Sequence, residues 1–118
     1  MATFTKKFLT GSTNGQQMKV TVTTNLTAQT IHTAVAGTGS IDEIWIYAYN
    51  DSGSSVNLTI LFGGTGEPDN KIFLPIAGQS GRTQVIDGMC LNNGLLVKAY
   101  ASSANVIILD GFVNNIAP

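Results

Sequence analysis

Charge is scarce in this sequence: its 118 residues include 6 lysines and arginines and 7 aspartates and glutamates, for a formal net charge of −1. Charged residues make up 11% of the chain, against about 25% in a typical soluble domain. So little positive charge excludes nucleic acid or an anionic membrane surface as an electrostatic partner. The apolar share of 43% also excludes a disordered chain.

Cysteine and long apolar runs are also lacking. Cys90 is the only cysteine, which excludes an internal disulfide and a zinc site built from cysteines. Such a chain suits a reducing cytoplasm. No apolar run approaches the roughly 20 residues that cross a bilayer, and the N-terminal residues lack the apolar stretch of a signal peptide. We therefore expect no membrane partner.

Short runs of alternating apolar and polar residues replace helical periodicity. Val, Ile, Thr and aromatic residues dominate these runs because they fit a pleated, half-buried surface. Turns rich in Gly, Asn and Ser separate the runs every 8 to 12 residues or so. The pattern predicts an all-β fold, an antiparallel β-sandwich of jelly-roll or Ig-like type with about eight strands. The expected strands span residues 16–24, 29–35, 41–50, 56–62, 71–76, 82–86, 95–101 and 105–113.

The first fifteen residues have a different pattern, which predicts an N-terminal arm over 1–15 and a sandwich domain over 16–118. A flexible stretch from Gly11 to Gly15 ends the arm. One interpretation is an extended arm that becomes ordered on a partner, and the other is an edge strand followed by a loop. In the first case the contact residues of the arm are Phe4, Lys6, Lys7 and Phe8.

Catalytic patterns are weak. His32 is the only histidine, so a Ser-His-Asp site would have to use it, with Ser80 as the nearest candidate nucleophile. The segment around Ser80 lacks the second glycine of a G-x-S-x-G elbow. A histidine on a Thr-rich strand is more typical of a surface or pocket-lining position. We expect no catalytic residues, no cofactor and no enzymatic activity.

The acidic residues do not form a catalytic pair either, because neighbours on a strand, such as Asp42 and Glu43, point to opposite faces. Glu67, Asp69 and Asn70 share one loop and could bind calcium through oxygen ligands. Their spacing is not that of a known calcium loop, and acidic residues beside Pro and Gly are also ordinary turn formers. We therefore assign no metal ligands from the sequence. Whether this loop binds an ion stays an open question at this point.

An aromatic row is the most informative feature. Alternation places Trp45, Tyr47 and Tyr49 on one face of one strand. Tyr and Trp are enriched at protein interfaces, where an apolar ring and a polar tip are both useful. Three interpretations stay open: a face covered by core or loops, a subunit interface, and a platform for sugar rings. The opposite face of the strand carries Ile44, Ile46 and Ala48.

Residues 28–116 carry a resemblance to a known group. The run 42–50 (DEIWIYAYN), the run 58–65 (LTILFGGT) followed by Pro68-Asp69, and the C-terminal runs 93–106 and 111–114 resemble small virion proteins of tailed bacteriophages. The similarity lies in strand and turn patterns, and it does not cover the N-terminal arm.

The resemblance implies a capsid decoration, or cement, protein: a β-sandwich, commonly a homotrimer, that binds the major capsid protein and stabilises the assembled head. It also implies a place on the capsid surface of the virion, with assembly in the bacterial cytoplasm. The alternative is a phage tail or fibre module that binds a glycan of the host surface.

Overall fold

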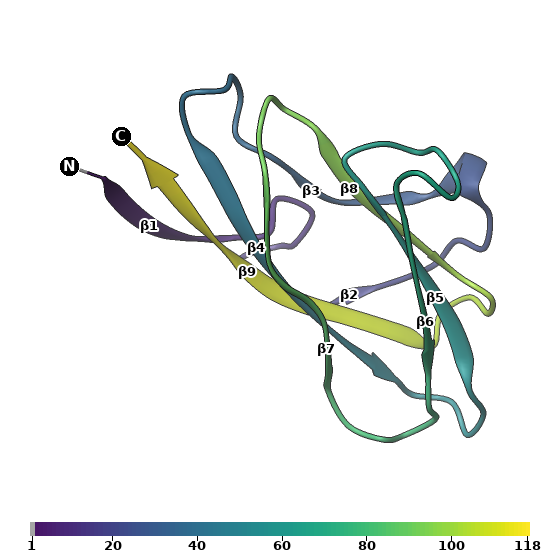
Figure 1. Ribbon diagram of the computed structural model, residues 1–118. Helices are drawn as coiled ribbons and strands as arrows, with labels where there is room; N and C mark the ends of the chain where they lie inside the picture. Colours follow the sequence, from purple (N-terminus) through teal and green to yellow (C-terminus); the bar gives the residue numbers. More distant parts are fainter. Residues whose placement is uncertain (1) are drawn as a thin grey trace.

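Two antiparallel sheets, packed face to face, make up the computed structural model, which describes residues 2–118 (Figure 1). The prediction of an antiparallel β-sandwich is confirmed, with nine strands within residues 2–118 rather than about eight. The elements are β1 (Thr3–Phe8), β2 (Met18–Lys19), a 3₁₀ turn η1 (Asn25–Thr27), β3 (Gln29–Thr33), β4 (Ile41–Asn50), β5 (Val56–Phe62), β6 (Lys71–Ile76), β7 (Thr83–Leu91), β8 (Leu96–Ala101) and β9 (Ile107–Ala117).

The two sheets differ in strand order. In the first sheet the order is β1-β9-β4-β7, and the short β2 also pairs with β9. In the second sheet the order is β3-β8-β5-β6. The edges of the sandwich are therefore β1 and β7 on the first sheet, with the two-residue β2 on the same side of β9 as β1, and β3 and β6 on the second.

The bounds of β4, β5 and β6 are those that the alternation predicts, whereas other strands differ. β7 is longer than expected and ends at Leu91. The register with β4 shifts at Gly88, which has a φ of 86°, and the pairing resumes beyond it. β9 continues to Ala117, where it gains β1 as a partner. Of the strand expected over 16–24, only Met18–Lys19 pairs regularly.

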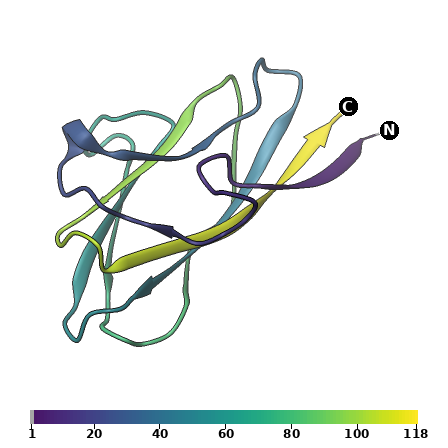
Figure 2. The same ribbon diagram turned by 180° about the vertical axis from the view of Figure 1, so that it is seen from behind.

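The N-terminal residues are part of the first sheet, as in the edge-strand interpretation. β1 pairs with β9 in unbroken register from Thr3 opposite Ala117 to Phe8 opposite Phe112. The boundary expected at residue 15 therefore does not separate an arm from the sandwich, because backbone pairing joins β1 to the last strand of the chain. Both views show β1 beside the end of β9, reaching beyond the second sheet (Figures 1 and 2). All six side chains of β1 are exposed.

The core lies between the sheets, where inward-facing side chains of β4 and β9 pack with those of β5 and β8. A Cβ atom at Gly111 in β9 would collide with the carbonyl oxygen of Trp45, so the close approach of β9 to β4 requires glycine there. Burial of each large apolar side chain stabilises the fold by about 1.5–3 kcal/mol. The large, fully buried members of the core are Leu9, Val20, Ile31, Ile44, Ile46, Leu58, Ile60, Ile86, Val97, Ile107 and Leu109.

Candidate functional site

The aromatic row of β4 lies on the solvent side of the first sheet. Burial alternates residue by residue along this strand, as the sequence predicts. Trp45, Tyr47 and Tyr49 are half-buried on the outer side, and the apolar residues between them are fully buried. The row is therefore a surface feature, and neither the core nor a loop fully covers it.

The register of β9 brings the contact residues of β1 to the same side. Residues directly opposite each other in antiparallel strands share a face. Phe112 lies opposite both Phe8 of β1 and Trp45 of β4, and Asn114 lies opposite both Lys6 and Glu43. We call this surface the outer face. It carries Phe4, Lys6 and Phe8 from β1, Glu43, Trp45, Tyr47 and Tyr49 from β4, and Ile108, Asp110, Phe112 and Asn114 from β9.

Six of the seven contact residues expected from the sequence thus converge on the outer face, although β1 and β4 are more than thirty residues apart in the chain. Lys7 is the exception. It lies opposite Val113, whose side chain is fully buried, so Lys7 is on the other side of the sheet. Simple alternation after Lys6 also gives Lys7 this orientation.

Aromatic stacking organises the centre of the outer face. The rings of Trp45 and Phe112 are stacked, with centroids 6.0 Å apart and planes inclined by 14°. The ammonium group of Lys6 lies 4.3 Å from the centroid of Phe112, a cation–π contact. The indole N–H of Trp45 donates to a carboxylate oxygen of Glu43 at 3.1 Å. A Cβ atom at Gly88 would lie 2.9 Å from the indole ring, so glycine also leaves room for the tryptophan.

A second cluster lies beside the stacked pair. The guanidinium group of Arg82 covers the ring of Tyr47, 3.8 Å from its centroid, and also donates to Asp110. The hydrogen bond to Asp110 raises the pKa of Arg82 further above its already high ordinary value. The charges of this part of the face are therefore compensated within the chain.

Sequence reasoning missed five residues of the outer face, and it also missed Arg82, which contacts the face from just before the start of β7. The five are Glu43, Ile108, Asp110, Phe112 and Asn114. Alternation over residues 105–113 does place Asp110 and Phe112 on one face. That this face adjoins the aromatic row depends on the pairing of β9 with β4, which no local pattern specifies.

Exposure is greatest at the β1 end of the face. Phe4 and Phe8 expose 69% and 62% of their surface, whereas the aromatic residues of β4 are only partly exposed. Both rings lie on the outer face, and aromatic residues are among the types enriched in protein interfaces.

His32 is not at the surface, contrary to the expectation from its Thr-rich strand. It is 3% exposed, and both ring nitrogens are engaged: Nδ1 accepts from the backbone N–H of Thr10 at 3.1 Å, and Nε2 donates to Asp42 at 2.8 Å. These bonds define the neutral tautomer with its proton on Nε2. The candidate nucleophile Ser80 follows β6, at the edge of the second sheet opposite to β3, and donates to the carbonyl of Ala77. The structure does not bring Ser80 and His32 together.

Asp42 is the centre of this buried network. Its carboxylate also accepts from the side chain of Asn115 at 2.8 Å and from the backbone N–H of Val35 at 3.0 Å. Burial raises the pKa of Asp42, but the hydrogen bonds from Asn115, His32 and Val35 together hold it below its ordinary value. The network joins the first sheet to β3 and to the turn after β1, so its geometry is that of a structural element.

In the loop considered for calcium, the carboxylate of Glu67 is already bonded to side chains from other parts of the chain. The carboxylate of Glu67 accepts from Asn25 at 2.6 Å and from the hydroxyl of Tyr100 at 2.9 Å, and it forms an ion pair with Lys71 at 3.2 Å. These contacts lower the pKa of Glu67, and the hydrogen bond from Asn25 has the largest effect. The ammonium group of Lys71 thus supplies the positive charge beside this carboxylate. Within residues 2–118 no three His, Cys, Asp or Glu side chains are grouped as metal ligands.

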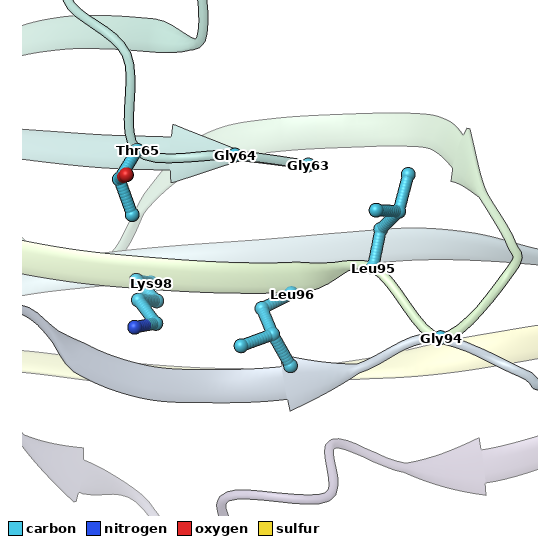
Figure 3. Close-up of a pocket in the computed structure, with 7 residues that line it drawn as sticks. All are labelled: Gly63, Gly64, Thr65, Gly94, Leu95, Leu96 and Lys98. Carbon is cyan, nitrogen blue, oxygen red and sulfur yellow. The ribbon is translucent and has the colours of Figure 1, made fainter.

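A shallow pocket of about 240 Å³ lies where this loop meets β8 (Figure 3). Its wall combines the backbone of Gly63 and Gly64 with the side chains of Leu95, Leu96 and Lys98. Polar side chains are few there, and none of the contact residues expected from the sequence lines it. The outer face remains the better candidate for a functional site.

Comparisons of the chain with protein-family models, with curated proteins and with solved structures gave no match. Within the described residues, no helix has the length and apolar character needed to cross a membrane. The function must therefore be inferred from the surface and the sequence.

Proposed function

We propose that this protein is a non-enzymatic structural protein of a tailed phage, a decoration or cement protein that binds and stabilises the assembled head. One observation carries the proposal: six residues from two distant segments, expected from the sequence to make protein contacts, form one aromatic face. The resemblance of residues 28–116 to small tailed-phage virion proteins adds the particular kind of partner, the major capsid protein.

The chemistry of the outer face suits a protein contact. Its centre is built from Trp45, Phe112 and Tyr47, and aromatic residues and arginine are the residue types enriched in interfaces. Because Arg82 is already paired with Asp110, covering the face would leave neither of these charges without a partner. Binding only to the assembled head shifts the equilibrium toward assembly, and many copies per particle multiply the effect.

Imaging of particles of the phage that encodes the protein tests the proposal. Density for the protein spread over the capsid faces is the expected result. Density confined to the tail, or the absence of the protein from purified particles, would overturn it.

We further propose that the protein is a homotrimer, as the resemblance implies. Light scattering at micromolar concentration should then give about three times the chain mass of 12.4 kDa. A strictly monomeric protein, with and without capsid, would remove the trimer but not the binding of the head.

The second candidate is a tail or fibre module that binds a host glycan. The observation in its favour is the stacked pair of Trp45 and Phe112, because flat rings at a surface can pack against sugar rings. A glycan array distinguishes the two functions. Saturable binding to one sugar class, lost in Trp45→Ala, would favour the glycan module.

A further inference from the structure

The four sheet edges of the sandwich differ in how open they are to another strand. An exposed edge presents unpaired backbone groups, and natural proteins block such edges with bulges, proline, covering loops or charge. In β7 the register with β4 shifts twice, and in β6 Pro75 removes one backbone donor. In β3 there is a shift as well, and Gly11 already donates to the carbonyl of Ile31 at 2.9 Å.

β1 has no bulge and no proline, and the turn that follows it reaches only its last residue, where Gly15 lies against the ring of Phe8. Its six residues are in regular register with β9, none of them is proline, and no backbone group of residues 3–8 bonds to a loop in the described chain. Its side chains are exposed on both sides of the sheet. The only device that protects this edge is charge, from Lys6 and Lys7.

The two lysines set the chemistry of the strand that fits. Neither forms an ion pair with any of residues 2–118. None of the seven acidic residues precedes Asp42 in the sequence, so β1 itself carries positive charge only. Glu43, two strands away on the outer face, accepts hydrogen bonds from Trp45 and Asn114. Like charges opposite each other in neighbouring strands are destabilising and unlike charges are favourable. A second β1 strand in a register that pairs the lysines is thus disfavoured, and a strand with two adjacent acidic residues is favoured.

We propose that β1 is a strand-addition site, where an extended acidic segment of a partner protein pairs with the free edge of the first sheet. Two adjacent acidic residues of that segment face Lys6 and Lys7 on the two sides of the sheet. Apolar residues on either side of them lie beside the exposed rings of Phe4 and Phe8. The inference rests on the proposed function in taking the partner to be the capsid protein, but its test needs no capsid.

The test titrates the full-length protein with a free peptide while backbone amides are followed by NMR. In antiparallel register, the peptide TVEETVT places valine opposite Phe8 and Phe4 and glutamate opposite Lys7 and Lys6. We expect saturable shifts and slowed amide exchange confined to β1 and its neighbour β9. The peptide TVKKTVT should bind about tenfold more weakly at low salt.

The charge-swapped variant Lys6→Glu/Lys7→Glu is the matched control, because both substitutions are at exposed positions. It should reverse the preference and bind the lysine peptide more tightly. A merely structural role of the lysines would not produce this reversal.

Three results would overturn the proposal. Equal binding of both peptides would remove the charge selectivity, and shifts without slowed exchange in β1 would remove strand addition. Protection of β1 that rises with protein concentration in the absence of peptide would make a second copy of the chain the occupant. Each of these results is independent of whether the protein binds a phage head.

Discussion

Ile44 and Trp45 are neighbours in β4 but lie on opposite sides of the first sheet. The side chain of Ile44 is fully buried between the sheets, whereas the indole of Trp45 stacks on Phe112 at the solvent side. The inner side of this strand therefore holds the sandwich together, and its outer side carries the rings that we propose contact a partner.

Alanine substitutions at these two positions should separate stability from binding. Ile44→Ala leaves a cavity in the core and should lower the free energy of unfolding by about 2–5 kcal/mol. Trp45→Ala removes a partly exposed ring and its stacking on Phe112, so the free energy of unfolding should fall by only about 1–2 kcal/mol. Urea unfolding of both variants measures the difference. A larger loss for Trp45→Ala would mean that the tryptophan is mainly a core residue.

The buried network around Asp42 predicts loss of stability in acid. Because the pKa of Asp42 is lower in the folded chain than in the unfolded one, protonation favours the unfolded state. The contribution of Asp42 is complete above its unfolded pKa, about 4, and is lost as the pH falls through the lower folded pKa. Urea midpoints of wild type and Asp42→Asn between pH 7 and pH 2 test this. The stability gap between them should narrow below about pH 4, and a gap that does not change with pH would contradict the prediction.

Glu67 should hold the loop over residues 63–70 in place. Glu67→Gln removes the charge that attracts Lys71 and weakens the bonds from Asn25 and Tyr100, so amide exchange in this loop should become faster. Acid should have the same effect as this substitution. The lowered pKa of Glu67 means that its contacts favour the ionised carboxylate, so protonation should weaken them and speed amide exchange in the loop. Asp69→Asn, a nearby exposed substitution, is the control. Equal effects of the two variants would show that Glu67 has no special role.

β1 should contribute little to stability despite its place in the sheet. Deleting residues 2–8 removes exposed side chains and the pairing with β9 but no side chain of the core, so the melting temperature should fall by about 5 °C, equivalent to roughly 1 kcal/mol. Leu9→Ala, just beyond the deletion, removes a side chain that is 1% exposed and should lower the free energy of unfolding by about 2–5 kcal/mol. Thermal melts of both proteins test the comparison. If the deletion is the more damaging change, β1 is an essential strand of the fold.

The parts of the fold that follow from local pattern could be predicted from the sequence. β4, β5 and β6 alternate strictly between turns rich in Gly, Asn and Ser, and their ends coincide with the expected ones. The pairing of β1 with β9 could not be predicted, because it joins residues about a hundred positions apart. The bond from His32 to Asp42 also had no local signal, although the two residues are ten positions apart, because it depends on how β3 and β4 of different sheets pack together.

The candidate site shows the same division. Alternation identified the aromatic row of β4, and composition identified Phe4, Lys6 and Phe8. Their convergence depends on β9, whose Phe112 and Asn114 lie opposite residues of both other strands. A single sequence specifies the members of such a surface more readily than their arrangement.

We propose that the outer face binds the phage head. The most direct measurement is the affinity of the protein for purified heads that lack it, comparing Phe4→Ala/Phe8→Ala with Phe73→Ala. Phe73 is a matched control because its ring is 53% exposed in β6, on the other sheet. The account predicts that the double substitution weakens binding at least about tenfold and that Phe73→Ala binds like wild type. Unchanged binding of the double variant, or an equal loss in Phe73→Ala, would contradict it.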